Sequence, residues 1–87
     1  MYKVKYHKQV IKFLQKQDVK IRKEIVSFFD LLKTVPYDFK HYDVKVFKGY
    51  PDTYRLRIRK YRVIFSIKDH EVLIEVIRAG SRGDIYK

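Results

Sequence analysis

The segment TYRLRIRKYRVIFSI, residues 53–67, decides the fold because apolar and charged side chains alternate on both sides of Arg59-Lys60. Alternation with a period of two is typical of strands that bury one face and expose the other. If Arg59-Lys60 is a two-residue turn, Thr53–Ile58 and Tyr61–Ile67 pair as an antiparallel hairpin. The sequence therefore predicts two adjacent strands in its C-terminal half.

This hairpin predicts one apolar face and one arginine-rich face. Its register sets Arg57 directly opposite Arg62, with Arg55 on the same face, although like charges opposed across a ladder destabilise a sheet. Guanidinium groups bind phosphate bidentately, so we interpret this face as a phosphate site. Two alternatives remain: a solvated face decorated with arginine, or a register slip by one residue, which would exchange the faces. The predicted apolar face consists of Leu56, Ile58, Tyr61, Val63, Phe65 and Ile67.

The flanking sequence completes an α+β fold. The segment from Tyr2 to Tyr6 alternates as a strand does. Apolar residues at helical spacing then predict a short helix from Lys8 and a second, longer helix that begins after the N-cap Asp18 and ends where Val35 precedes Pro36. We expect a loop over residues 36–48 and a last strand over residues 72–78, antiparallel to its neighbour. The expected order is βααβββ, with two helices on one face of a twisted, mainly antiparallel four-stranded sheet.

Composition narrows the class of protein. The 87 residues are short enough for a single domain, residues 1–87, and 21 Lys and Arg against 10 Asp and Glu give a formal charge of +11, which indicates a polyanionic partner. There is no cysteine, and no apolar run approaches the length of a membrane span. We therefore expect a cytoplasmic protein without a membrane segment, disulfide or cysteine-ligated metal.

Acidic and imidazole groups are few in the predicted site. Glu75 is expected on the arginine face beside Ile64, where an ion pair would orient Arg55. His7, His41 and His70 fall in separate parts of the chain and match no metal motif, so we expect neither a metal site nor any cofactor.

Six short motifs follow one another over nearly the whole chain. They are Tyr2-Lys-Val-Lys-Tyr6, Leu14-Gln-Lys-Gln-Asp18, Lys48-Gly49, Tyr54-Arg-Leu-Arg-Ile58, Tyr61-Arg62-Val63 and Ile77-Arg-Ala-Gly-Ser-Arg82-Gly-Asp-Ile-Tyr86. No single motif is diagnostic, but in their order and spacing they resemble the RelE/ParE superfamily of small bacterial and archaeal toxins. The resemblance implies a microbial ribonuclease-like βααβββ fold and, on the RelE side, cleavage of messenger RNA in the ribosomal A site.

The resemblance also implies a set of site residues. Arg62 and Arg82 would bind the phosphate, and Tyr86 would stack on the nucleotide or act as the general base. Arg55 and Arg57 stand at positions that are often lysine in the family, which puts a general-base role for them in doubt because guanidinium does not readily lose its proton. Further RNA contacts are expected from Arg59, Lys60 and Lys48.

Three functions follow from the resemblance. The first is an A-site-dependent endoribonuclease toxin that binds the ribosome and messenger RNA and is restrained by a RelB-like antitoxin in a hetero-oligomer. The second is a ParE-like inhibitor of DNA gyrase, which would need neither the arginine face nor Tyr86. The third is a noncatalytic RNA-binding module or decayed toxin, in which arginine has replaced essential lysines.

Overall fold

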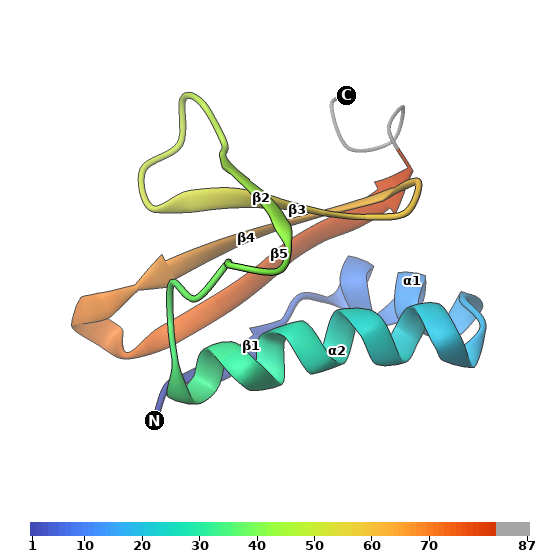
Figure 1. The fold of residues 1–87 in the computed structure, drawn as a ribbon, viewed down its shortest axis with the longest axis horizontal. Helices are drawn as coiled ribbons and strands as arrows, with labels where there is room; N and C mark the ends of the chain where they lie inside the picture. Colours follow the sequence, from blue (N-terminus) through green and yellow to red (C-terminus); the bar gives the residue numbers. More distant parts are fainter. Residues whose placement is uncertain (82–87) are drawn as a thin grey trace.

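The computed structural model describes residues 1–81 of the chain. Two helices and five strands make up this part, and neither helix is long and apolar enough to cross a membrane. Figure 1 shows their arrangement. In chain order the elements are β1 (Lys3–Tyr6), α1 (Lys8–Lys16), α2 (Val19–Thr34), β2 (Asp43–Val46), β3 (Thr53–Ile58), β4 (Tyr61–Lys68), the 3-10 turn η1 (Asp69–Glu71) and β5 (Leu73–Ser81).

The strands form one sheet in the order β1-β5-β4-β3-β2. β1 runs parallel to β5, and every other neighbouring pair is antiparallel. Both helices lie against the same face of this sheet, and no helix of residues 1–81 lies on the opposite face (Figure 1). The predicted α+β class with two helices on one face is confirmed.

The sheet has five strands rather than the predicted four, because β2 forms within the segment expected to be a loop. β2 is an edge strand of four residues that pairs only with β3 among the described strands, with Asp43 opposite Arg57 and Val46 opposite Tyr54. Its Val46 side chain is 71% exposed. Only Val44 of this strand packs against the core, and an alternation over four residues is too short to identify a strand, which explains the missed strand.

The second helix begins and ends as its sequence predicts. Asp18 is extended at the N-cap, and its side chain accepts a hydrogen bond of 3.0 Å from the Ile21 backbone N–H. The helix ends at Thr34, and Val35 then leaves helical geometry before Pro36, whose ring disfavours the α conformation in the preceding residue. This helix buries Ile21, Ile25, Phe28, Phe29 and Leu32.

An aromatic cluster forms the centre of the core between α2 and the sheet. Phe28, Phe29 and Phe65 are fully buried, and their ring centroids lie 5.0 to 5.6 Å apart in edge-to-face geometry. Such pairs contribute beyond their buried area because the edge of one ring meets the face of the next. Phe65 therefore anchors the helix-covered face of the sheet, as expected from the sequence.

The β3–β4 register is the predicted one. Arg57 lies opposite Arg62, Leu56 opposite Val63 and Arg55 opposite Ile64. The last strand differs from its prediction: β5 runs from Leu73 to Ser81, and a bulge shifts its pairing with β4 between Ile64 and Phe65.

Candidate functional site

The helix-free face of β3, β4 and β5 carries four arginines, which we call the arginine face: Arg55, Arg57, Arg62 and Arg78. Residues paired across a ladder share a face, so the observed register assigns Arg55, Ile64 and Arg78 to one row and Arg57 and Arg62 to the next. The three arginines predicted to share this face do so. Arg78 was missed, because the bulge that aligns it with Ile64 leaves no clear signal in the sequence.

The Arg62 side chain has no ion pair or hydrogen bond to any residue in 1–81, and its Nε is buried without an acceptor among them. Opposite it, Arg57 donates from Nε to the backbone oxygen of Arg59 over 3.4 Å. A buried donor without a partner costs free energy, and so does a pair of like charges in direct opposition. A phosphate between the two arginines would relieve both costs.

Arg55 is mostly buried and is held by an acid from β2. Its side chain is 14% exposed, and Nη2 lies 2.8 Å from Asp43 Oδ1, while Nε is buried without a partner. Asp43 was also missed, since its segment was expected to be a loop. The edge strand thus fixes the Arg55 guanidinium in place through Asp43.

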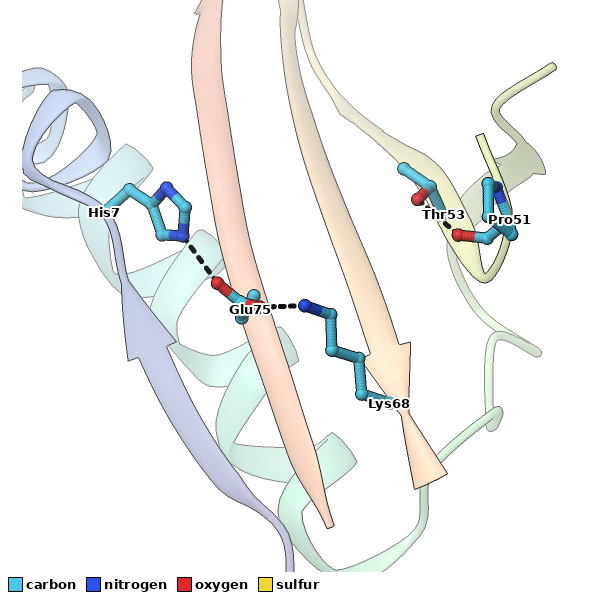
Figure 2. Close-up of polar contacts among 5 residues, drawn as sticks. All are labelled: His7, Pro51, Thr53, Lys68 and Glu75. Carbon is cyan, nitrogen blue, oxygen red and sulfur yellow. Dashed lines mark hydrogen bonds and ion pairs between the residues drawn. The ribbon is translucent and has the colours of Figure 1, made fainter. Parts of the chain in front are cut away.

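The predicted Glu75–Arg55 ion pair is wrong. Glu75 lies opposite Ser66, and its carboxylate contacts His7 Nε2 at 2.8 Å and Lys68 Nζ at 2.5 Å (Figure 2). The two hydrogen bonds hold the pKa of Glu75 well below its usual range, at about 2, and Glu75 raises the pKa of Lys68. The Glu75 carboxylate is thus bound by Lys68 and His7, and β5 supplies no carboxylate to the four arginines.

The histidines lie in three different places. His7 precedes α1 and contacts Glu75, whereas His70 lies in the turn η1. His41 lines a groove of about 590 Å³ together with Arg57 and Arg59, which was not expected from the sequence. Among residues 1–81, no three His, Asp or Glu side chains come close enough together to hold a metal ion.

The remaining predicted RNA contacts divide between the two sides of the molecule. Arg59 is tied to α2 by an ion pair of 2.8 Å with Glu24, and Lys60 lies 5.4 Å from the ring centroid of Tyr61. The Arg59 side chain is thus bound to the helical side, although its backbone oxygen accepts a hydrogen bond from Arg57 and both residues line the groove with His41. Lys48 instead lines a groove with Arg55. Arg82 and Tyr86 lie outside the described residues.

Comparison with known proteins identifies the family. Residues 4–86 match the model of the ParE toxin of type II toxin-antitoxin systems. The curated "Putative toxin RelE1" of Methanocaldococcus jannaschii is 30% identical over 99% of this chain and 96% of its own length. The structure of the archaeal RelE-RelB complex from Pyrococcus horikoshii is 34% identical, with a TM-score of 0.82 over 94% of this chain and 96% of that one.

A further solved structure, the RelB-RelE complex of Methanococcus jannaschii, is 26% identical, with a TM-score of 0.78 over 94% of each chain. The isolated RelE toxin of E. coli, at 21% identity and a TM-score of 0.74 over 99% of this chain and 92% of that one, shares the fold. With a family model spanning nearly all residues and relatives matched over their full length, the chain belongs to the RelE/ParE family of toxins of type II toxin-antitoxin systems.

Proposed function

We propose that this RelE-like toxin is an endoribonuclease that cleaves messenger RNA in the ribosomal A site and thereby stops translation. In the proposed reaction the ribose 2′-hydroxyl attacks the adjacent phosphorus, and the bond from phosphorus to the 5′-oxygen breaks. A base removes the 2′ proton and an acid returns a proton to the 5′-oxygen, which leaves a 2′,3′-cyclic phosphate and a 5′-hydroxyl. The proposed ribosomal target implies action in the cytoplasm.

The observation that carries this proposal is the opposition of Arg57 and Arg62 on an open sheet face. Folding alone does not require two cations in one cross-strand pair, or a buried Arg62 Nε without an acceptor. A phosphodiester supplies the missing acceptors, and its transition state carries more negative charge on the oxygens than its ground state. The same face therefore favours binding of RNA and stabilisation of the reacting phosphate.

Each predicted site residue has a role in this scheme. Arg62 and Arg82 stabilise the charge on the pentavalent phosphorane, while Arg55 and Arg57 hold the neighbouring backbone. Because arginine stays protonated, none of the four serves as the base, and the resemblance leaves Tyr86 for that role. A tyrosine is a weak base near neutral pH, so the reaction depends on the ribosome to hold the substrate in line.

The proposed partner that restrains the toxin is a RelB-like antitoxin. The related structures from Pyrococcus horikoshii and Methanococcus jannaschii are complexes of RelE with RelB. A chain with a formal charge of +11 favours an acidic partner, because complementary charge speeds association and suppresses wrong partners. We expect the hetero-oligomer to form in the resting cell.

A second candidate function is inhibition of DNA gyrase, which the match to the ParE toxin model favours. Gyrase inhibition needs no phosphate site on the sheet, so the arginine face would have no role in that function. A decayed toxin that only binds RNA is the third candidate, because arginine stands where the family often has lysine.

One experiment separates the three candidates. The purified toxin is incubated with a defined message, with and without programmed ribosomes, and in parallel with gyrase and supercoiled DNA. Codon-positioned cuts that appear only with ribosomes support the proposal. Gyrase-linked DNA breaks without RNA cleavage would instead support the second candidate, and RNA binding without either product would support the third.

The role of Tyr86 is tested in the same assay. Tyr86→Phe keeps the ring and removes the ionisable hydroxyl, and loss of a general base lowers a rate by about 10² to 10⁴. We expect that loss in single-turnover cleavage. A Tyr86→Phe variant as fast as the parent, beside a slow Tyr86→Ala variant, would show that the ring stacks on the nucleotide and that the base lies elsewhere.

A further inference from the structure

An aromatic pair, half-buried Phe47 and exposed Tyr50, lies in the loop between β2 and β3. The rings of Phe47 and Tyr50 are stacked, with centroids 5.3 Å apart and planes inclined by 29°, and Tyr50 is 62% exposed. The loop is closed by hydrogen bonds from Phe47 N to Thr53 O and from Tyr50 N to Phe47 O, and Gly49 supplies the positive φ of its turn. These rings are therefore held in place without being buried.

A basic groove lies next to this pair. It has a volume of about 360 Å³, near the lower limit for pockets that take small ligands, and no acidic side chain lines it. Neither Lys45 nor Lys48 forms an ion pair within the described part of the chain, and the buried Nε of Arg55 has no partner. The lining residues are Lys45, Val46, Phe47, Lys48 and Arg55.

This groove is continuous with the arginine face. Lys45 lies directly opposite Arg55 in the β2–β3 ladder, and the bond from Phe47 N to Thr53 O extends the ladder by two residues. Alternation along a strand therefore places Lys45 and Phe47 on the same face as Arg55. A strand of RNA that has one phosphate at Arg55 and Arg62 would reach this groove with its neighbouring nucleotide.

We propose that the groove and the aromatic pair form a subsite for one unpaired nucleotide next to the scissile phosphate. Its base stacks on the Phe47–Tyr50 pair, and its phosphate contacts Lys45 and Lys48. Stacked aromatic rings beside cations are the combination by which proteins hold single-stranded nucleic acid without reading its sequence. The inference rests on the proposed function, because it assumes that the substrate on the arginine face is RNA.

The test measures binding of a short, unstructured 2′-O-methyl RNA to the full chain by fluorescence anisotropy, without ribosomes and at fixed salt. The 2′-O-methyl group blocks cleavage, so this assay does not depend on catalysis. Loss of one stacked base weakens binding by about 5- to 100-fold, and we expect that loss for Tyr50→Ala and near-parental affinity for Tyr50→Phe. Equal affinity of Tyr50→Ala and the parent would overturn the subsite.

Two controls separate stacking from charge. Inorganic polyphosphate, a polyanion without bases, is expected to bind Tyr50→Ala and the parent equally, and equal losses for both ligands would overturn base stacking. Lys48→Ala should lower the dependence of RNA affinity on salt more than Lys12→Ala, a matched change on α1. If the two lysine variants have the same salt dependence, the groove does not hold a phosphate.

The two proposals fail separately. If ribosomes programmed with message are not cut but Tyr50→Ala still weakens RNA binding, the proposed function fails and the subsite stands. If cleavage occurs and Tyr50 has no effect on RNA binding, the subsite fails. A Tyr50→Ala variant that loses affinity for the antitoxin but not for RNA would likewise overturn the subsite and assign this surface to the protein partner.

Discussion

The two faces of the sheet use the same strands for opposite purposes. On the helix-covered face of β3 and β4, Leu56, Val63 and Phe65 are fully buried. On the other face, Arg57 opposes Arg62, and the buried Nε atoms of Arg55 and Arg62 have no acceptor among residues 1–81. One face buries apolar side chains in the core. The other face keeps opposed cations and unpaired donors, and a bound phosphate would relieve both costs.

This contrast follows from the geometry of a strand. Because neighbouring residues point to opposite faces, Leu56 can stabilise the fold while Arg55 and Arg57 on either side of it remain available for a ligand. The sheet therefore gains its rigidity from one set of residues and its proposed activity from another. Substitutions on one face should change stability, and substitutions on the other should change activity.

The largest expected effect is on stability, from Phe65 on the helix-covered face. Phe65→Ala removes a fully buried ring that packs on Phe28 and Phe29, and such truncations cost about 3 to 5 kcal/mol. Urea unfolding at neutral pH measures the loss. The exposed Tyr50 is the matched control, and Tyr50→Ala should cost about 1 kcal/mol or less. Similar losses for the two variants would contradict the assignment of the core.

The next effect is on activity, from the arginine face. Arg62→Ala should lower single-turnover cleavage of A-site message by about 10² to 10³, the loss typical of one preorganised donor to a transition state. Its unfolding free energy should not fall, because the Arg62 side chain has no ion pair or hydrogen bond within residues 1–81 and its removal ends the repulsion with Arg57. Cleavage is measured at saturating ribosomes so that binding does not limit the rate.

Arg59→Ala is the control for Arg62→Ala. Arg59 carries the same guanidinium group as Arg62 and lies at the turn of the same hairpin, but its guanidinium pairs with Glu24 on α2. We expect its cleavage rate to stay within about threefold of the parent, since an exposed pair contributes little. If Arg59→Ala is as slow as Arg62→Ala, the functional surface extends around the turn onto the helical side.

The contrast between the faces was largely predictable from the sequence, because it depends on local alternation. Apolar side chains recur with period two on both sides of Arg59-Lys60 and predict that Arg57 opposes Arg62, and the observed register excludes the alternative slip by one residue. The cap at Asp18 and the end of the helix before Pro36 also depend only on neighbouring residues.

The partners of individual charges were not predictable, because they depend on long-range pairing. Glu75 meets His7 only because β1 joins β5 in parallel, and their side chains come from positions 68 residues apart. The turn over residues 69–72 pairs Lys68 with Leu73 and so places Glu75 opposite Ser66 rather than Ile64, and the bulge between Ile64 and Phe65 then brings Arg78 opposite Ile64. Asp43 holds Arg55 through an edge strand whose alternation covers only four residues, Asp43–Val46, too few to separate a strand from a loop.

A smaller effect concerns Glu75, the acid that the arginine face does not use. Its hydrogen bonds with Lys68 and His7 lower its pKa to about 2, whereas the pKa of a glutamate side chain in the unfolded chain is about 4.3. The folded state therefore keeps this carboxylate ionised where the unfolded state takes up a proton. Its contribution to stability is present above about pH 5 and is lost as the pH falls toward 2.

Glu75→Gln tests this assignment. It should cost about 1 to 3 kcal/mol at pH 7, the scale of hydrogen bonds to charged groups, and should flatten the fall in unfolding free energy between about pH 5 and 2. Urea unfolding as a function of pH measures both. Asp30→Asn, which breaks an exposed ion pair of 3.3 Å with Lys33, should cost less than about 0.5 kcal/mol. Equal pH profiles for Glu75→Gln and the parent would exclude Glu75 as the titrating group.

The smallest expected effect has the opposite sign and bears most directly on the comparison of the faces. Arg57→Thr removes one of two like charges opposed across the ladder and inserts a residue that favours strands, so it should raise the unfolding free energy by about 0.2 to 1 kcal/mol. The gain should shrink at high salt, because screening weakens the repulsion in the parent. Arg78→Thr is the control, since Arg78 lies opposite Ile64 on its β4 side and has no opposed cation there. Asp43 lies opposite Arg57 on the β2 side, but its carboxylate is bound to Arg55 and offsets the repulsion only in part.

A stabilised Arg57→Thr variant that cleaves message more slowly would show that the opposed arginines are kept for function at the expense of stability. A destabilised variant would show instead that Arg57 is held by Asp43, and that the arginine face is part of the folding energy after all.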